Sequence, residues 1–227
     1  MGHYYIYADA NSKKGFSPRG ASKLMEHSYI HNSASALLYA TLASPHFAEK
    51  IIKEADSVYA DAIGFMVGKK PIHVGDYSIN HEGLYSSYEP LVNDNEELRK
   101  GLADVIHNGP PLYVVNETKG VYLDIRDNRL YAAYKGRIKG HWLIVDPLSL
   151  LLADQGEGGG GDYRSGYINH ELVGSWIGDY VYVTNSLDDV KECIKKEVII
   201  FIEGDDAQKE AESVKTFFEA VSKGMKG

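Results

Sequence analysis

The sequence predicts an α+β fold with a helical N-terminal part, an antiparallel β-rich middle and an αβα C-terminal segment. Amphipathic helical patterns dominate residues 1–109, short runs of β-forming residues separated by turn residues follow, and a helix–strand–helix pattern closes the chain. Helices and strands are thus segregated, which favours α+β over a doubly wound parallel sheet. No shift in composition marks a linker, so we expect a single domain over residues 1–227, helix-rich over 1–109 and β-rich with C-terminal helices over 110–227.

The first two elements are a strand and a helix. Residues 3–10 alternate in the manner of a strand, with Tyr4, Ile6 and Ala8 on one face. A loop containing glycine and proline follows. Residues 21–43 then have helical character, with a break expected at 33–35.

The clearest helix is expected to run from residue 44 to residue 63. Ser44 is a good N-terminal cap, and Pro45 suits the first turn of a helix. Apolar residues recur at spacings of three and four and form one stripe that we expect to be buried: Phe47, Ile51, Ala55, Val58 and Ala62.

Gly64, Gly68 and Pro71 end this helix, and an extended segment is expected to follow as far as residue 79. Residues 94–97 have the form of a capping box, which predicts a further short helix. The apolar side of that helix consists of Leu98, Leu102 and Ile106.

The middle of the chain has a different character. Four segments have the composition of strands and a fifth apolar run follows them, at 112–115, 120–125, 130–134, 140–145 and 148–153. Residues 155–161 are rich in glycine and predict a flexible loop. The remaining elements are expected to be a strand at 179–184, a helix at 186–197, a strand at 198–202 and a helix at 205–223.

The charge argues against a nucleic-acid partner. The net charge is −8, whereas a dedicated nucleic-acid surface is usually basic. Two short basic stretches stand out against this background but do not outweigh it: Lys13 and Lys14 with Arg19, and Lys135, Arg137 and Lys139.

Cysteine content and hydropathy limit the class further. Cys193 is the single cysteine, which excludes an intramolecular disulfide and a multi-cysteine metal site. We see no signal-peptide pattern and no apolar run near the ~20 residues that span a bilayer. We therefore expect cytoplasmic synthesis, no membrane association and no cofactor. The 17 tyrosines combine apolar surface with a hydroxyl group and suit protein interfaces.

The tetrapeptide INHE occurs twice and places His81 beside Glu82 and His170 beside Glu171. If the two copies met in space, they would offer two imidazoles and two carboxylates. These four residues are the basis of an alternative function, a hydrolase with or without a divalent metal. Because the flanking segments are unalike, we interpret the repeat as coincidence or as a locally repeated turn.

Two further groups of residues are candidates for binding. His27 and His31 are four residues apart, so on a helix both would project from one face and could ligate one metal ion. No HExxH pattern supplies more ligands, so we predict no metal site and keep this pair as the alternative. The glycine run at 158–161 is interpreted as an arm that orders against a neighbouring subunit, with Tyr163 and Arg164 as interface anchors, or else as a passive connector.

Residues 44–82 contain a Ser-Pro helix start, an amphipathic helix rich in Ala, Glu and Lys, a proline, and the strand entry GDYSI. This stretch resembles the neck and tail-completion proteins of long-tailed bacteriophages. The resemblance implies a small α+β fold that assembles as a ring at the head–tail junction or the tail end of a virion. Val74 stands where those proteins usually have threonine, and the resemblance brings no catalytic residues.

The leading hypothesis is therefore a non-enzymatic, oligomer-forming structural protein, a phage virion neck or tail component whose partners are further copies of itself and other assembly proteins. No residue spacing selects a catalytic triad, and the many tyrosines favour protein contacts. The alternatives are the hydrolase described above and a small-ligand binding module in which the glycine run acts as a lid.

Overall fold

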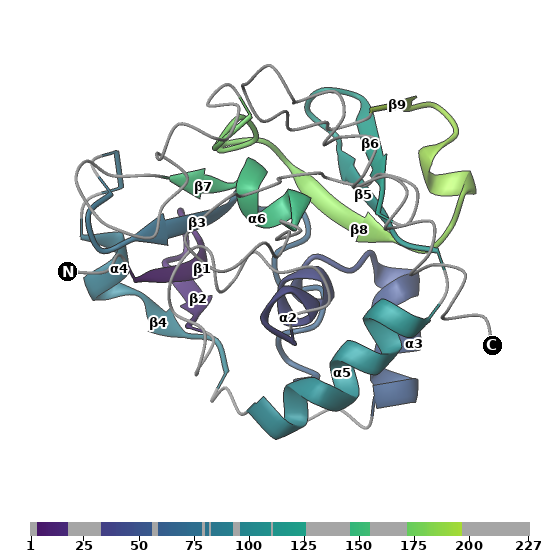
Figure 1. The fold of residues 1–227 in the computed structure, drawn as a ribbon, viewed down its shortest axis with the longest axis horizontal. Coiled ribbons are helices and arrows are strands. Elements are labelled where there is room, and N and C mark those ends of the chain that lie inside the picture. The colour runs from purple at the N-terminus through teal and green to yellow at the C-terminus, as the bar shows by residue number, and fades with distance from the viewer. Residues whose placement is uncertain are drawn as a thin grey trace, which may run out of the picture.

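The computed structural model describes residues 4–17, 33–55, 59–78, 80–81, 83–92, 96–109, 111–125, 146–154 and 172–196. Within them, two mixed β-sheets and a set of short helices make up the fold (Figure 1). Both sheets contribute side chains to one main hydrophobic core. None of the helices in these residues has the length and apolar character that would let it cross a membrane.

The five-stranded sheet has the strand order β4-β2-β1-β3-β7. Its strands are β1 Tyr5–Asp9, β2 Lys14–Phe16, β3 Pro71–Gly75, β4 Glu89–Pro90 and β7 Ala153–Asp154. β1 pairs antiparallel with β2 and β3, whereas the β2–β4 and β3–β7 pairs are parallel. Because β1 lies at the centre and both of its faces are covered, all five of its residues are buried.

The four-stranded sheet has the order β8-β5-β6-β9. Its strands are β5 Tyr113–Asn116, β6 Val121–Asp124, β8 Val181–Thr184 and β9 Ile194–Lys195. β5 pairs antiparallel with β6 and β8, and β9 runs parallel to β6. The tight β5–β6 turn ends at Gly120, whose φ of 62° is left-handed and therefore favours glycine.

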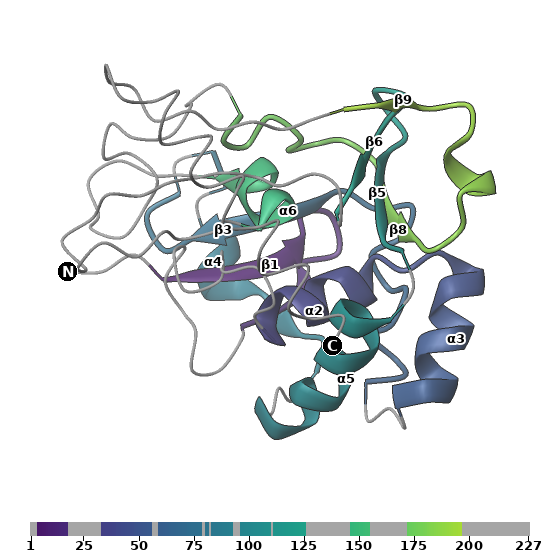
Figure 2. The same cartoon turned by 45° about the vertical axis from the view of Figure 1, so that its right-hand side comes forward.

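Three longer helices lie together on one side of the molecule, as both views show (Figures 1 and 2). They are α2 Ser33–Thr41, α3 Pro45–Ala55 and α5 Glu96–Asn108. α5 packs against both α2 and α3. The side chains of residues 35–41 in α2 are all buried, so this helix passes through the core and does not lie on its surface.

Two short helices cover the two faces of the five-stranded sheet. α6 Pro147–Leu151 is completely buried in the main core, on the face to which Tyr5 and Tyr7 project. α4 Leu84–Ser87 lies on the opposite face, where Leu84 packs against alternate residues of β1 and β3 in a smaller cluster. This single turn of helix and the loop before it form one wall of the candidate site.

The predicted fold class is wrong in two respects. Residues 1–109 are not a helical part, because β1 to β4 are interleaved with its helices. The sheets are mixed, with three parallel pairings, and not purely antiparallel. The strands that create these pairings include β4, β7 and β9, which are two residues long, and so short a strand carries no periodicity that a sequence pattern could reveal.

Three predicted segments also differ from the observed ones. The helix predicted at 44–63 ends at Ala55, and residues 59–69 form turns instead. The helix predicted at 186–197 is replaced by the short 3-10 helix η1 Asp188–Val190 and by β9. The apolar run at 148–153 is mostly α6, because the Asp146 side chain caps a helix that begins with proline.

Several element predictions are confirmed. β1, β3, β5, β6 and β8 overlap the segments predicted as extended, and α2 occupies the end of the helix predicted at 21–43. Phe47, Ile51 and Ala62 of the predicted stripe are buried, as are Leu102 and Ile106 of α5. Other predicted elements lie outside the described residues: the strands at 130–134, 140–145 and 198–202, the helix at 205–223 and the glycine run.

Candidate functional site

His81 lies in the loop after β3, and a buried serine fixes the start of this loop. The Ser78 hydroxyl accepts a hydrogen bond from the Gly75 N–H at 2.9 Å and donates one to the carbonyl oxygen of Asp154 at 2.8 Å. The end of β3 is thereby tied to the end of β7. The chain then turns so that Asn80 and His81 both contact the Asp154 side chain.

A buried carboxylate orients the imidazole of His81. His81 Nδ1 lies 2.8 Å from Asp154 Oδ2, and Asn80 Nδ2 donates to Oδ1 of the same carboxylate at 3.4 Å. The Asp154 side chain is 4% exposed, whereas that of His81 is 27% exposed. An imidazole held by a buried carboxylate and accessible to solvent has the arrangement of a general acid or base.

An open depression of about 420 Å³ lies beside His81, and its size falls within the range of small-molecule sites. Its walls come from the β1–β2 turn, the loop that carries His81, and α4. The residues of this His81 depression are Ala10, Lys13, His81, Gly83, Leu84, Ser86 and Ser87.

The β1–β2 turn holds Lys13 in an unusual backbone conformation. Its φ is 56°, which makes it the one residue other than glycine with a left-handed φ among those that the structure describes. Such a conformation costs a lysine roughly 1–3 kcal/mol. Backbone hydrogen bonds compensate for it: the Lys13 N–H donates to the Asp9 carbonyl at 3.0 Å, and the Lys13 carbonyl accepts from the Glu89 N–H at 2.8 Å.

The Asp9 side chain stabilises the same turn by accepting two backbone hydrogen bonds. Its Oδ2 accepts from the Ser12 N–H at 2.9 Å and its Oδ1 accepts from the Lys70 N–H at 3.4 Å. Burial opposes ionisation of this carboxyl group, but hydrogen bonds from Ser12, Asn11 and Lys70 outweigh it and hold the pKa of Asp9 below its ordinary value. The lysine side of the depression is therefore fixed by backbone contacts to an ionised carboxylate.

The two serines of the depression have their hydroxyl protons engaged. Ser86 Oγ and Ser87 Oγ both donate to the Gly83 carbonyl, at 3.1 and 2.6 Å. Within the described residues neither hydroxyl is hydrogen-bonded to His81. This arrangement does not define a serine nucleophile.

Of the residues predicted as candidates, the structure places one. His81 pairs with Asp154, which was not predicted. Asp154 directly follows the apolar run at 148–153, and nothing in that local sequence links it to His81. The other candidates lie outside the described residues: Glu82, His170, Glu171, His27, His31, Tyr163 and Arg164. In the part of the chain that the structure describes, no group of three or more His, Cys, Asp or Glu residues could hold a metal ion.

A second polar arrangement, the buried polar cluster, lies wholly inside the main core and consists of Tyr7, Tyr39, His73, Asp146 and Ser149. The Tyr39 hydroxyl donates to Asp146 Oδ2 at 2.7 Å, and the Ser149 N–H donates to Oδ1 at 2.8 Å. The Tyr7 hydroxyl and Ser149 Oγ are 2.7 Å apart, and the His73 and Tyr7 rings stack with centroids 4.2 Å apart. All five residues are at most 1% exposed, so no substrate reaches them.

Burial dominates the electrostatics of this cluster. It raises the pKa of Asp146 above the ordinary value of 3.8, although the hydrogen bonds from Ser149 and Tyr39 lower it in part. It also raises the pKa of Tyr39 well above 10.0, with the negative charge of Asp146 as the second cause. The cluster links α2, α6, β1 and β3, and its role is structural.

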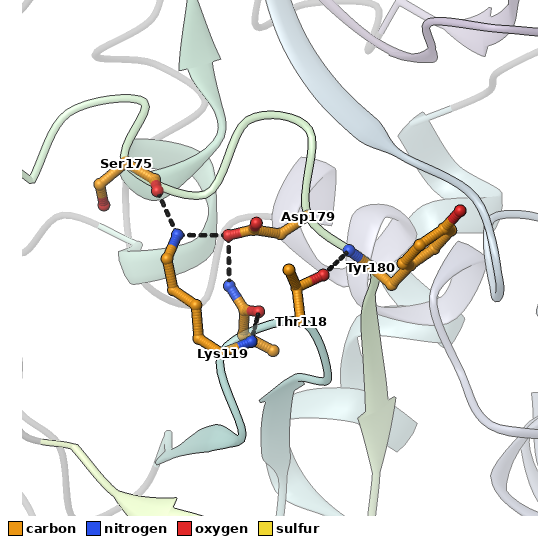
Figure 3. Close-up of polar contacts among 6 residues, drawn as sticks. Thr118, Lys119, Ser175, Asp179 and Tyr180 are labelled. Carbon is orange, nitrogen blue, oxygen red and sulfur yellow. Dashed lines mark hydrogen bonds and ion pairs between the residues drawn. The ribbon is translucent and has the colours of Figure 1, made fainter.

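A third arrangement, the lysine clamp, consists of Asn116, Lys119 and Asp179 together with the Ser175 carbonyl. Figure 3 shows Lys119 in contact with Ser175 and Asp179. The Lys119 ammonium donates to the Ser175 carbonyl at 2.7 Å and also pairs with Asp179 Oδ2. Asn116 Nδ2 donates to the same Asp179 oxygen at 2.7 Å. All of its charges are paired within the clamp, which leaves no group free to act on a substrate.

Backbone contacts beside the clamp join the same two segments. The Tyr180 N–H donates to Thr118 Oγ1 at 2.8 Å, as Figure 3 shows, and the Glu117 N–H donates to the Tyr180 carbonyl at 2.9 Å. The β5–β6 turn is thus fastened to the segment that leads into β8. We interpret the lysine clamp as a structural fastening.

The His81 depression is consequently the one of these three arrangements that combines an oriented titratable side chain with access for a small molecule. No family model, curated protein or solved structure matches this chain. The geometry of the depression is therefore the basis on which a function can be argued.

Proposed function

We propose that the His81 depression is a hydrolytic site in which His81 acts as the general base. The observation that carries this proposal is the 2.8 Å contact between His81 Nδ1 and Asp154 Oδ2 at the wall of an open depression. It retains His81 from the predicted hydrolase alternative and replaces the predicted glutamates by Asp154.

The contact determines which imidazole nitrogen can act. Because an ionised carboxylate accepts hydrogen bonds and cannot donate one, the proposal assigns the proton of the neutral imidazole to Nδ1 of His81. In the neutral imidazole the lone pair is then on Nε2, which is the nitrogen that accepts a proton. The imidazolium that forms is stabilised by the negative charge of Asp154, as in other carboxylate–histidine pairs.

Water is the nucleophile that this arrangement favours. Ser86 and Ser87 already donate to the Gly83 carbonyl, and the depression is open to solvent. Nε2 would take a proton from a water molecule whose oxygen attacks the acyl or phosphoryl centre of a substrate held against the same wall. The bond to the leaving group then breaks, and the imidazolium returns the proton to the leaving oxygen or nitrogen.

A substrate panel tests this proposal. The full chain is assayed against chromogenic carboxylic esters, phosphate esters and amides. We expect His81→Gln to lower kcat about 10²–10⁴-fold on any substrate that is hydrolysed. Asp154→Asn is expected to lower kcat similarly, because its amide can donate to Nδ1 and favour the unproductive tautomer.

The matched control is His46→Gln. His46 is exposed at the start of α3 and contributes nothing to the depression, so activity should be unchanged. An inactive parent across the whole panel, or a His81→Gln variant as active as the parent, would exclude the proposal.

Self-association is a second proposal, which the sequence predicts and one observation favours. Leu187 and Ile194 are 61% and 68% exposed, the highest values for large apolar side chains in the described part of the chain. Leu187 directly precedes η1, and Ile194 is the first residue of β9. Exposed apolar side chains at the edge of a sheet are typical of contacts between chains. The subunit would then belong to a ring, as the likeness to phage neck and tail proteins implies, with Tyr163 and Arg164 still predicted as anchors.

Sedimentation velocity tests this second proposal. A defined oligomer that Leu187→Glu weakens would support it. A control must be an exposed residue, which excludes buried ones such as Leu84. Lys191→Glu, an exposed change in the same segment, is the suitable control. A parent that sediments as a monomer at high concentration would contradict it.

A further inference from the structure

Four lysines gather at one end of the five-stranded sheet. Lys13 and Lys14 lie at the β1–β2 turn, and Lys69 and Lys70 immediately precede β3. The Ala10 N–H donates to the Lys70 carbonyl at 3.4 Å, so the two segments run side by side. The pKa of Lys69 is lowered, first by burial and then by the positive charge of Lys14, although Asp9 opposes the shift. A chain with a net charge of −8 thus has a locally positive end.

These lysines differ in how their charges are used. The Lys69 ammonium lies 2.9 Å from the centroid of the Phe65 ring, and the Lys70 ammonium lies 5.3 Å from that of Tyr180. Such cation–π contacts occupy both groups. The Lys13 and Lys14 ammonium groups make no ion pair or ring contact within the described residues. Lys13 is the lysine that lines the His81 depression.

The lining of the depression therefore includes a cationic side chain, Lys13, as well as His81. The Asp154 carboxylate is buried, contacts His81 and Asn80, and does not line the depression, so an entering anion would meet Lys13 and His81 and not this carboxylate. The backbone of Lys13 is held on both sides by hydrogen bonds, so the origin of its side chain is fixed relative to the depression.

We infer that the His81 depression binds substrates through an anionic group, a phosphate or a carboxylate, which pairs with Lys13. This inference rests on the proposed hydrolytic site and names the class of substrate that it takes. His81 would act on the bond next to that group, while Lys14 adds to the attraction without touching the ligand.

Inorganic phosphate and acetate are the probes for the test, since each carries one of the two anionic groups. The full chain is titrated with each anion, and the imidazole C–H signals of His81 are followed by NMR. At least one anion should give a saturable shift that weakens as NaCl is added. The probe that binds more tightly identifies the group.

Three variants assign the binding to Lys13. Lys13→Gln should weaken the anion about tenfold, the loss expected for one partly screened ion pair. Lys13→Arg, which keeps the charge, should retain binding. Lys14→Gln is the matched control and should change the affinity less than about twofold, because only screened, longer-range attraction is lost. Melting curves establish that each variant is folded.

Two results would overturn the inference: no saturable shift in the parent with either anion, or equal affinity in Lys13→Gln and the parent. The outcomes also separate it from the proposed function. Binding that depends on Lys13 in a chain that hydrolyses nothing leaves an anion site without catalysis. In the alternative outcome, hydrolysis depends on His81 and yet is equally fast for neutral and anionic esters, and equally fast in Lys13→Gln. That result would mean that His81 is a general base without anion recognition.

Discussion

The buried polar cluster and the lysine clamp both fasten distant segments of the chain to each other, but they differ in how far water reaches them. Each joins segments far apart in the sequence through a carboxylate that accepts more than one hydrogen bond. Asp146 lies in the main core at 1% exposure, whereas the clamp joins buried Asn116 and Asp179 to a Lys119 side chain that is 44% exposed. The exposure of this lysine, and not the number of contacts, is the difference between them.

This difference determines how much each arrangement stabilises the fold. A buried donor that loses its acceptor cannot turn to water, so its loss costs about 1–3 kcal/mol. A half-exposed lysine that loses its partner is simply hydrated, and exposed ion pairs contribute roughly 0–1 kcal/mol. The core cluster should therefore govern stability, and the clamp should mainly fix the local position of the β5–β6 turn.

Asp146→Ala is expected to have the largest effect. It leaves the Tyr39 hydroxyl and the Ser149 N–H without their acceptor inside the core and removes the cap of α6. We expect a loss of about 3 kcal/mol in the free energy of unfolding. Urea unfolding of the parent and the variant measures it. A loss below about 1 kcal/mol would mean that the buried cluster stabilises no more than a surface pair.

A smaller effect is expected from pH, because the ionisation state of Asp146 contributes to the free energy of unfolding. Folding raises the pKa of Asp146 above 3.8, so the folded state favours the protonated carboxyl group. This contribution to stability is fully present below the unfolded pKa and is lost as the pH rises through the folded pKa. The stability of the parent relative to Asp146→Asn should therefore decrease as the pH is raised from about 3 to about 7.

Urea unfolding of both proteins at several pH values provides the measurement. Tyr7, Tyr39 and His73, the titratable side chains around Asp146, are the same in both proteins, so the difference isolates the carboxyl group. A difference that does not change with pH, or that increases as the pH rises, would contradict the prediction.

Substitutions in the lysine clamp should give the smallest losses in the free energy of unfolding, and removing Asp179 should cost more than removing Lys119. Asp179→Ala removes the acceptor of Asn116, which is fully buried, and is expected to cost about 1–2 kcal/mol. Lys119→Ala leaves the Asn116–Asp179 hydrogen bond in place and should cost less than about 1 kcal/mol, with a smaller loss in 1 M NaCl. A Lys119→Ala loss equal to that of Asp146→Ala would remove the distinction between the two arrangements.

Elements with a clear local periodicity were predictable. β1, the start of α3 and the apolar side of α5 follow from spacings of two, three or four residues, because one face of each must be buried. α6 shows the limit of such patterns, since a short apolar run fits a strand and a helix equally well. Here the cap and the proline decide for the helix.

The candidate site was half predictable. The repeated tetrapeptide INHE pointed to His81, but the alternative function based on it grouped this histidine with Glu82, His170 and Glu171. Asp154 is 73 residues further along the chain and ends a strand of two residues. No local pattern marks such a residue as the partner of a particular histidine.

The sequence by itself determined that β1 is extended, where α3 begins, and which side chains of α5 avoid water. Only the tertiary structure decided which strands are neighbours, and with them the pairs His81–Asp154 and Tyr39–Asp146, the latter 107 residues apart. The reason is physical: hydrophobic periodicity records that a face is buried but not what buries it. The parallel pairing of β3 with β7, which brings Asp154 to His81, arises when the whole core packs.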